Sequence, residues 1–165
     1  MFKYLALVIT LVVIMALTFF VPNRIHIPRY EDKGFRSALN SEIRGFLESK
    51  QSPLAPEVEF LLNQKHWKLL IAISAIESQY CKRQLGFNCW GVGGDNNYRH
   101  YSSIKSAIQD ANDLIEYWQQ KGRWLTVDDM NCHYVQPCNS NWESVVKKVL
   151  LELESYEQRA GTILR

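Results

Sequence analysis

The segment from His66 to Tyr80 constrains the fold more than any other part of the chain. Leucine, isoleucine or alanine fills seven of the eight positions from Leu69 to Ile76. A helix that is apolar on nearly every side lies inside a domain, because each of its faces needs a partner. The rest of the chain must therefore supply elements that surround this helix.

The spacing of apolar residues predicts what those elements are. From about Gly34 to Gln51, apolar residues recur at intervals of three and four, which is typical of an amphipathic helix. Ser102 or Ser103 is expected to cap a second such helix, Thr126 to begin a short one, and Asn141 to cap the last. These patterns predict helices on several sides of the buried segment.

Residues 81–103 break the helical pattern. They are rich in Gly, Asn and Tyr, which predicts a loop or a short irregular hairpin. The fold class we expect is therefore mainly α, with one helical domain at residues 36–165 that carries a short loop or hairpin insert.

The amino-terminal segment is expected to form a separate unit. Residues 4–22 contain no charge, and an apolar run of about 18 residues or more predicts a transmembrane helix. We expect an anchor at residues 1–23 that contacts the membrane through residues 4–22, then a polar linker at 24–35. A cleaved signal peptide is the main alternative, although its apolar region is normally about 7–15 residues long. A buried helix of a soluble protein is the second.

All four cysteines follow the apolar segment, as the closely spaced pairs Cys81/Cys89 and Cys132/Cys138. An even number of cysteines behind an export signal predicts disulfides formed in an oxidising compartment. The alternative is a metal site that adds His133 to the thiolates, but structural zinc sites usually separate their cysteines by roughly two to four residues. We therefore predict two disulfides, Cys81–Cys89 and Cys132–Cys138, and expect neither a metal nor a cofactor.

The charges and the cysteines point to opposite sides of the membrane. Arg24, Arg29, Lys33 and Arg36 follow the apolar segment, and the positive-inside rule would place them in the cytoplasm. We give the cysteines more weight and expect an anchored domain on the extracytoplasmic side, with secretion after signal cleavage as the alternative. A net charge of +2 gives no reason to expect a nucleic acid partner.

Glu77 interrupts the apolar pattern near the end of the buried helix. Partial burial disfavours the charged form of a carboxylate and raises its pKa, and the negative end of the helix dipole acts in the same direction. A carboxylic acid that stays protonated near neutral pH can protonate a glycosidic oxygen. The alternative is that Glu77 only marks the point where the helix reaches solvent.

Two segments together resemble the lysozyme-like superfamily, namely Ile73–Lys82, which contains Glu77-Ser78, and Asn88-Cys89-Trp90-Gly91-Val92. They are most similar to bacterial endo-β-N-acetylglucosaminidases and lytic transglycosylases. Those domains place a catalytic Glu in a Glu-Ser context at a helix end, followed by an Asn-x-Trp-Gly-Ile/Val segment. Later they have a Ser-rich turn before a helix and a Tyr before a Trp-containing helix.

The resemblance implies a role for each matched residue. Glu77 corresponds to the general acid, and Ser78 to a small polar residue that supports it or the bound sugar. Asn88, Trp90 and Gly91 correspond to the wall of the substrate groove, although Asn88 could instead cap a turn and Trp90 could belong to the core.

Near the carboxyl terminus, Tyr134 corresponds to a tyrosine that closes over the site, although it could instead pack only against the disulfide loop. The remaining tryptophans lie at helical spacings, and we expect them mostly in the core: Trp67, Trp118, Trp124 and Trp142.

The sequence departs from the family where the reaction type is decided. Glycosidases usually need a second carboxylate, and Asp95, in a Gly-Gly-Asp-Asn-Asn turn, is the only acidic residue between Cys81 and Ser103. A lytic transglycosylase needs only one Glu, but its Gly-Leu-Met-Gln segment is replaced here by Asn-Cys-Trp-Gly. The resemblance therefore implies a glycosidase that cleaves β-1,4 bonds in peptidoglycan or a related N-acetylated glycan, by either route. A catalytically inactive module that binds glycan or scaffolds an envelope complex is the alternative.

Overall fold

The computed structural model describes residues 33–93 and 97–162. Within these ranges the chain forms helices and no strand, which confirms the prediction of a mainly α fold. In chain order the elements are α2 (Lys33–Ser49), η1 (Ala55–Glu57), α3 (Val58–Leu62), α4 (Trp67–Ser78), α5 (Ile104–Gln120), α6 (Val127–Tyr134) and α7 (Ser140–Thr162).

The predicted anchor lies outside the described residues, and so does most of the predicted linker. The described end of that linker is helical, because α2 begins at Lys33. None of the described helices is long and apolar enough to span a bilayer.

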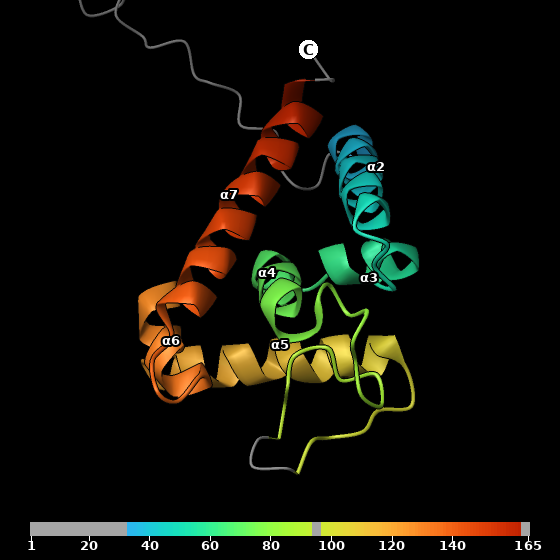
Figure 1. Ribbon diagram of the computed structural model, residues 1–165. Coiled ribbons are helices and arrows are strands. Elements are labelled where there is room, and N and C mark those ends of the chain that lie inside the picture. The colour runs from blue at the N-terminus through green and yellow to red at the C-terminus, as the bar shows by residue number, and fades with distance from the viewer. Residues whose placement is uncertain (1–32, 94–96, 163–165) are drawn as a thin grey trace, which may run out of the picture.

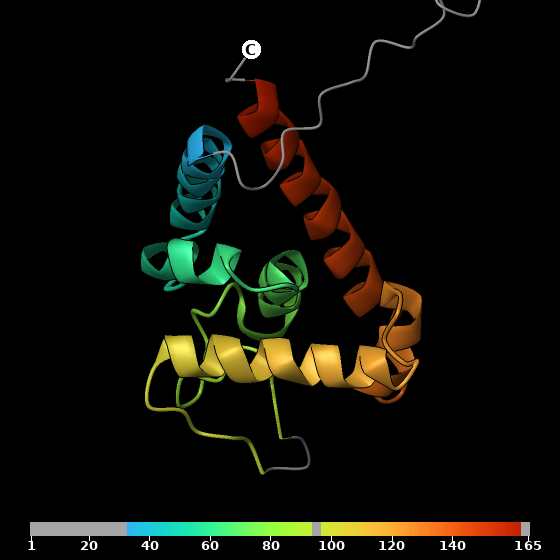
Figure 2. The same cartoon turned by 180° about the vertical axis from the view of Figure 1, so that it is seen from behind.

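Helix α4 occupies the centre of the domain, as its all-round apolar sequence predicts. The two opposite views show it between α7 and α2 on one side and α5 on the other (Figure 1, Figure 2). Its most extensive packing is against α7. This position places Glu77, in the last turn of α4, where α7 can reach it.

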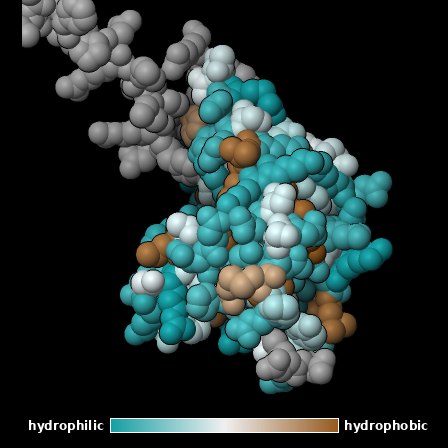
Figure 3. Space-filling view, turned by 60° about the vertical axis from the view of Figure 1, so that its left-hand side comes forward, coloured by the Kyte–Doolittle hydropathy of each residue, from teal (hydrophilic) through white to brown (hydrophobic). Residues whose placement is uncertain are grey.

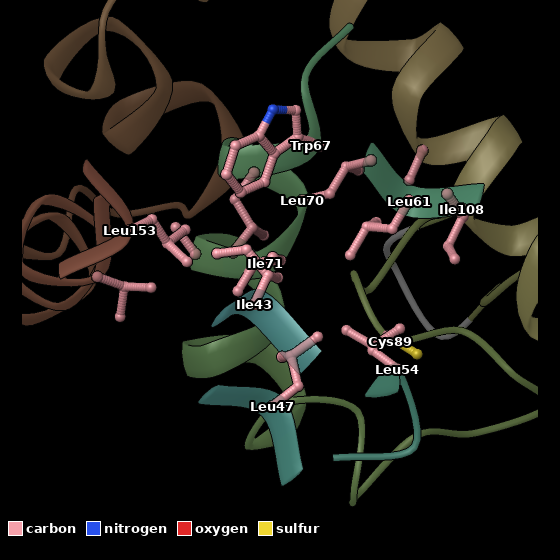
Figure 4. Close-up of a cluster of buried hydrophobic side chains, with 14 of the residues drawn as sticks. Ile43, Leu47, Leu54, Leu61, Trp67, Leu70, Ile71, Cys89, Ile108 and Leu153 are labelled. Carbon is pink, nitrogen blue, oxygen red and sulfur yellow. The ribbon is translucent and has the colours of Figure 1, made fainter. Parts of the chain in front are cut away.

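The core is built from side chains that four helices direct towards α4 (Figure 4). The fully buried residues labelled there include Ile43 from α2, Leu61 from α3, Ile108 from α5 and Leu153 from α7. Burying one such side chain contributes about 1.5–3 kcal/mol. The molecular face in Figure 3 is mostly hydrophilic, with its apolar side chains scattered rather than gathered in one patch.

Side-chain caps fix the starts of the later helices. Ser103 and Thr126 each accept a hydrogen bond from a backbone N–H three residues ahead, which confirms both predicted starts. The expected cap at Asn141 is wrong by two residues. The side chain of Asn139 accepts hydrogen bonds from the backbone N–H groups of Asn141 and Trp142, at 3.0 and 3.2 Å.

Residues 79–103 form a loop in the described part, with a single isolated bridge between Leu85 and Asn88 rather than a hairpin. The disulfide Cys81–Cys89 closes this loop, and Cys132–Cys138 closes the connection between α6 and α7. Both predicted disulfides are therefore confirmed. No group of His, Cys, Asp and Glu side chains in the described ranges is arranged to hold a metal ion.

Candidate active site

Glu77 is the last residue but one of α4 and reaches the surface there. Its carboxylate is held by the neighbouring helix α7, because the indole Nε1–H of Trp142 donates a hydrogen bond to Glu77 Oε1 at 2.7 Å. Trp142 belongs to the first turn of α7, and its side chain is almost completely buried. The contact therefore joins the centre of the fold to α7, the longest of the described helices.

Two opposing effects act on the pKa of Glu77. Burial raises the pKa, and the hydrogen bond from Trp142 lowers it by a smaller amount, so the pKa lies above its ordinary value. The C-terminal end of a helix also disfavours a negative charge. A carboxyl group in this environment keeps its proton at higher pH than an ordinary glutamate does.

Beside Glu77 lies an open cavity of about 210 Å³. Its described lining consists of Glu77, Ser78, Arg83, Leu85, Asn88, Gly91 and Tyr98. Within that lining, Glu77 is the only acidic residue and Arg83 the only basic one. Among the described residues, the guanidinium of Arg83 has no ion-pair partner, and Arg83 lines the cavity.

Gly91 allows the loop to pass close to the carboxylate. Its φ is +64°, a left-handed conformation that favours glycine, and a Cβ built on it would lie 3.4 Å from Glu77 Oε2. The two carboxylate oxygens therefore have different neighbours. Oε1 faces the indole of Trp142, and Oε2 faces the backbone of Gly91 at the cavity wall.

Ser78 supports the loop. It is buried, its hydroxyl donates to the carbonyl of Cys89 at 2.7 Å, and the same oxygen accepts from the backbone N–H of Cys81 at 3.0 Å. These bonds hold both ends of the disulfide loop against α4. The hydrogen bonds of Ser78 go to backbone groups and not to the carboxylate of Glu77, so Ser78 supports the loop that lines the cavity.

The side chain of Asn88 is buried and fully occupied by backbone groups. Its amide nitrogen donates to the carbonyls of Val92 and Arg99 at 2.7 and 3.1 Å, and its oxygen accepts from the N–H of Val92 at 3.0 Å. Asn88 therefore shapes the wall of the cavity, as a turn-capping residue does, and leaves no donor free for a ligand.

Trp90 lies in the core. Its side chain has no exposed surface, and its Nε1–H donates to the carbonyl of Leu70 at 2.8 Å. Two roles were open for Trp90, contact with substrate and packing in the core. Its complete burial matches packing in the core. Because the ring points into α4, it fixes the loop that carries Gly91 rather than lining the cavity.

Tyr134 lies in an aromatic stack and does not belong to the described lining of the cavity beside Glu77. Its ring lies between those of Trp124 and Trp142, at centroid distances of 5.4 and 5.5 Å, and its hydroxyl donates to the carbonyl of Trp90. Burial raises the pKa of this phenol well above its ordinary value, and the nearby charge of Glu77 adds to the effect. Tyr134 therefore stays neutral and ties α6 to the loop.

A second hydrogen-bond network holds the segment that begins at residue 97, directly after the residues 94–96 that the structure does not describe. Arg99 donates to both carboxylate oxygens of Asp110, at 2.9 and 2.7 Å, and the hydroxyl of Tyr101 donates to one of them at 2.6 Å. Asp110 belongs to α5, so this segment, which includes Tyr98, is fastened to that helix. Asp95, the candidate second carboxylate, lies outside the described residues.

Several residues of the site have no counterpart among the sequence predictions. The sequence predicts Trp142 mostly as a core residue; its ring is there, but no sequence pattern indicates where its N–H points. Leu85 and Tyr98 are 58% and 44% exposed, which is high for large apolar side chains. Apolar residues in a loop without helical periodicity are the signal that could have identified these two.

The chain was compared with protein-family models, with curated proteins and with solved structures, and none of the three comparisons gave a match.

Proposed function

We propose that this chain is a lysozyme-like glycosidase that cleaves β-1,4 bonds in peptidoglycan or a related polymer of N-acetylated sugars, with Glu77 as its general acid and base. One observation carries the proposal. The carboxyl group of Glu77 has a raised pKa, is fixed through one oxygen by Trp142, and borders an open cavity. An acid with a raised pKa beside an open cavity is what protonation of a glycosidic oxygen requires.

The cavity lining also supports a carbohydrate ligand. Leu85 and Tyr98 present exposed apolar surface at the same cavity as Glu77, and the C–H faces of sugar rings pack well on such surface. Arg83 supplies a positive charge there. That charge suits a glycan with carboxylate substituents, such as the lactyl ethers and stem peptides of peptidoglycan.

In the proposed reaction, Glu77 transfers its proton to the glycosidic oxygen as the bond from that oxygen to the anomeric carbon breaks. The ionised Glu77 then acts as the base. In the transglycosylase route it takes a proton from a hydroxyl of the same sugar, whose oxygen attacks the anomeric carbon and gives an anhydro end. In the hydrolytic route water attacks instead and gives a reducing end.

The number of carboxylates bears on the choice between these routes. Glu77 is the only acidic residue in the described lining, which supports the transglycosylase route because that route needs one carboxylate. Hydrolysis usually uses two, about 5–10 Å apart. Asp95 is the candidate that the sequence offers for the second carboxylate.

Cleavage can be measured with the purified full-length chain on isolated peptidoglycan. We expect turbidity loss and muropeptide release, and a decrease of about 10²–10⁴-fold in Glu77→Gln, the usual contribution of a general acid. Glu48→Gln is the matched control, because Glu48 is exposed on α2. Mass spectrometry of the products separates anhydro ends from reducing ends. Equal release by wild type and Glu77→Gln would contradict the proposal.

The single carboxylate of the described lining also favours a second function, that of a glycan-binding or scaffolding module without catalysis. In that case the chain would bind peptidoglycan in a pull-down assay but release no muropeptide. Glu77→Gln would then leave binding unchanged.

We propose a location on the extracytoplasmic side of a membrane, with residues 4–22 as the anchor. Two disulfides in a small domain support an oxidising compartment. Thiol labelling of the exported chain without reductant should find no free cysteine.

A further inference from the structure

The contact between Trp142 and Glu77 joins two residues that are 65 positions apart in the chain. Among the described residues, Trp142 is the only side chain that donates a hydrogen bond to this carboxylate. Indole nitrogen is a donor only, so this contact can never reverse its direction. The side chain of Trp142 is 2% exposed, so the donor of this hydrogen bond is shielded from water.

Building on the proposed function, we infer that Trp142 is the positioning residue of this site, and that its hold on Oε1 makes Oε2, the oxygen beside Gly91, the one that delivers the proton. A neutral carboxyl group carries its proton on one oxygen and accepts hydrogen bonds better at the other. Because the N–H of Trp142 occupies Oε1, the proton is favoured on Oε2. That oxygen lies against Gly91, which lines the cavity.

The indole has little freedom to turn away from Glu77. Its ring packs at 5.5 Å on Tyr134, which in turn packs at 5.4 Å on Trp124 and donates its hydroxyl hydrogen to the carbonyl of Trp90. Trp90 is itself bonded to α4 through the carbonyl of Leu70. Glu77 belongs to α4, and Trp142 is linked to the same helix through Tyr134 and Trp90.

The other polar groups near Glu77 act differently. Tyr134, from α6, is neutral, and its hydroxyl donates its hydrogen bond to the backbone carbonyl of Trp90. Arg83 and Tyr98, from the loop, line the cavity and can respond to a ligand. Among the described side chains, only the indole of Trp142, from α7, fixes the carboxyl group before a substrate arrives.

The test compares Trp142→Phe with Trp124→Phe. The first removes the N–H that Glu77 accepts, and the second removes an N–H from the same aromatic stack without touching Glu77. Each variant retains a ring at the mutated position. The pKa of Glu77 is followed in the full-length chain by NMR of ¹³C-labelled glutamate carboxyl groups, and muropeptide release is measured across pH.

In Trp142→Phe we expect the pKa of Glu77 to rise further, because a hydrogen bond that favours the charged form is lost. The alkaline limb of the profile of activity against pH should move to higher pH together with this pKa. The maximal rate should fall about tenfold, because the carboxyl group is no longer held in one orientation. Loss of packing alone would lower the rate without moving the limb. Trp124→Phe should leave both the pKa and the limb unchanged.

An unchanged pKa of Glu77 in Trp142→Phe, or the same shift in Trp124→Phe, would overturn the inference. If Trp142→Phe does not fold, a benzothienylalanine at position 142 replaces the N–H by sulfur at nearly constant shape. An unchanged pKa of Glu77 in that variant would likewise overturn the inference. Absence of glycan cleavage by the wild type would refute the proposed function alone. The NMR titration would still show whether Trp142 controls the protonation of Glu77.

Discussion

Three glycines offer the same substitution in three different environments. Gly45 lies inside α2, with nothing within 4 Å of a built Cβ. Gly122 follows α5 with φ +70° and also has open space around its Cβ. Gly91 has φ +64°, and its Cβ would lie 3.4 Å from Glu77 Oε2. Replacing each by alanine separates backbone strain from contact with the candidate catalytic group.

The expected stabilities differ in sign. Gly45→Ala should stabilise the fold by about 0.5–1 kcal/mol, because glycine inside a helix costs that much relative to alanine. A left-handed alanine costs roughly 1–2 kcal/mol, of which a lower entropy of the unfolded chain offsets about 0.4–1 kcal/mol. Gly122→Ala should therefore lose about 1 kcal/mol. Gly91→Ala should lose about as much, because its Cβ would lie at an ordinary van der Waals distance from Glu77 Oε2.

Urea unfolding of the full-length variants measures these differences, and muropeptide release measures activity under folding conditions. Gly45→Ala and Gly122→Ala should release muropeptides at the wild-type rate. Gly91→Ala should lose about tenfold or more, because a methyl group beside Oε2 displaces the reacting oxygen of the substrate.

Two results would refute this reasoning. If Gly91→Ala were as stable as wild type, the left-handed backbone at this position would be wrong. If Gly91→Ala were destabilised yet fully active, Oε2 would not be the oxygen that meets the substrate.

Four further predictions concern the same region. The folded chain binds the proton of Glu77 more tightly than the unfolded chain does, because burial raises the pKa of this carboxyl group. The stability that the bound proton contributes is complete below the ordinary pKa of 4.5 and is lost as pH rises through the raised pKa. The urea midpoint of Glu77→Gln should therefore exceed that of wild type at pH 7 and approach it at pH 4. Replacing Cys81 and Cys89 together by alanine should cost about 2–3 kcal/mol in urea unfolding, and a loss near zero would contradict a stabilising disulfide. Ser52→Ala should lower the free energy of unfolding by about 1–3 kcal/mol. Its buried hydroxyl donates to the carbonyl of Tyr80 at 2.7 Å and accepts from the N–H of Leu54 at 3.1 Å. Ser49→Ala, at a more exposed position, is the control. Arg83→Ala should weaken binding of carboxylate-bearing glycans in calorimetry but leave binding of neutral chitooligosaccharides unchanged, and equal losses for both would argue against charge recognition.

Helical periodicity predicted much of the fold correctly. The all-round apolar run marked α4 as the central helix, and the expected caps Ser103 and Thr126 begin α5 and α6. These features are local, because a helix start depends on a side chain and a backbone group only three residues apart. The shift of the last cap from Asn141 to Asn139 follows from a non-local cause. The side chain of Asn131, in α6, accepts from the N–H of Asn139 at 2.8 Å and fixes where the turn ends.

For the candidate site, the sequence indicated the acid but not its surroundings. Glu77 stood out as a charge at the end of an apolar helix, and the loop with Gly91 was expected beside it. The positions of Asn88 and Trp90 depend on hydrogen bonds to Arg99 and Leu70, which are 11 and 20 residues away. Composition and spacing contain no information about such partners.

The sequence by itself determined that a mainly helical domain surrounds α4, that four cysteines pair locally, and that a carboxyl group lies at the end of the buried helix. The tertiary structure alone decided that Trp142 holds Oε1 of Glu77 and that Gly91 leaves Oε2 at the cavity. Periodicity reports which side chains are buried, because burial depends on the face of a helix. The direction of a polar atom at the end of a buried ring depends instead on how α4 and α7 pack, and the positions of these two helices become fixed relative to each other only when the whole core assembles.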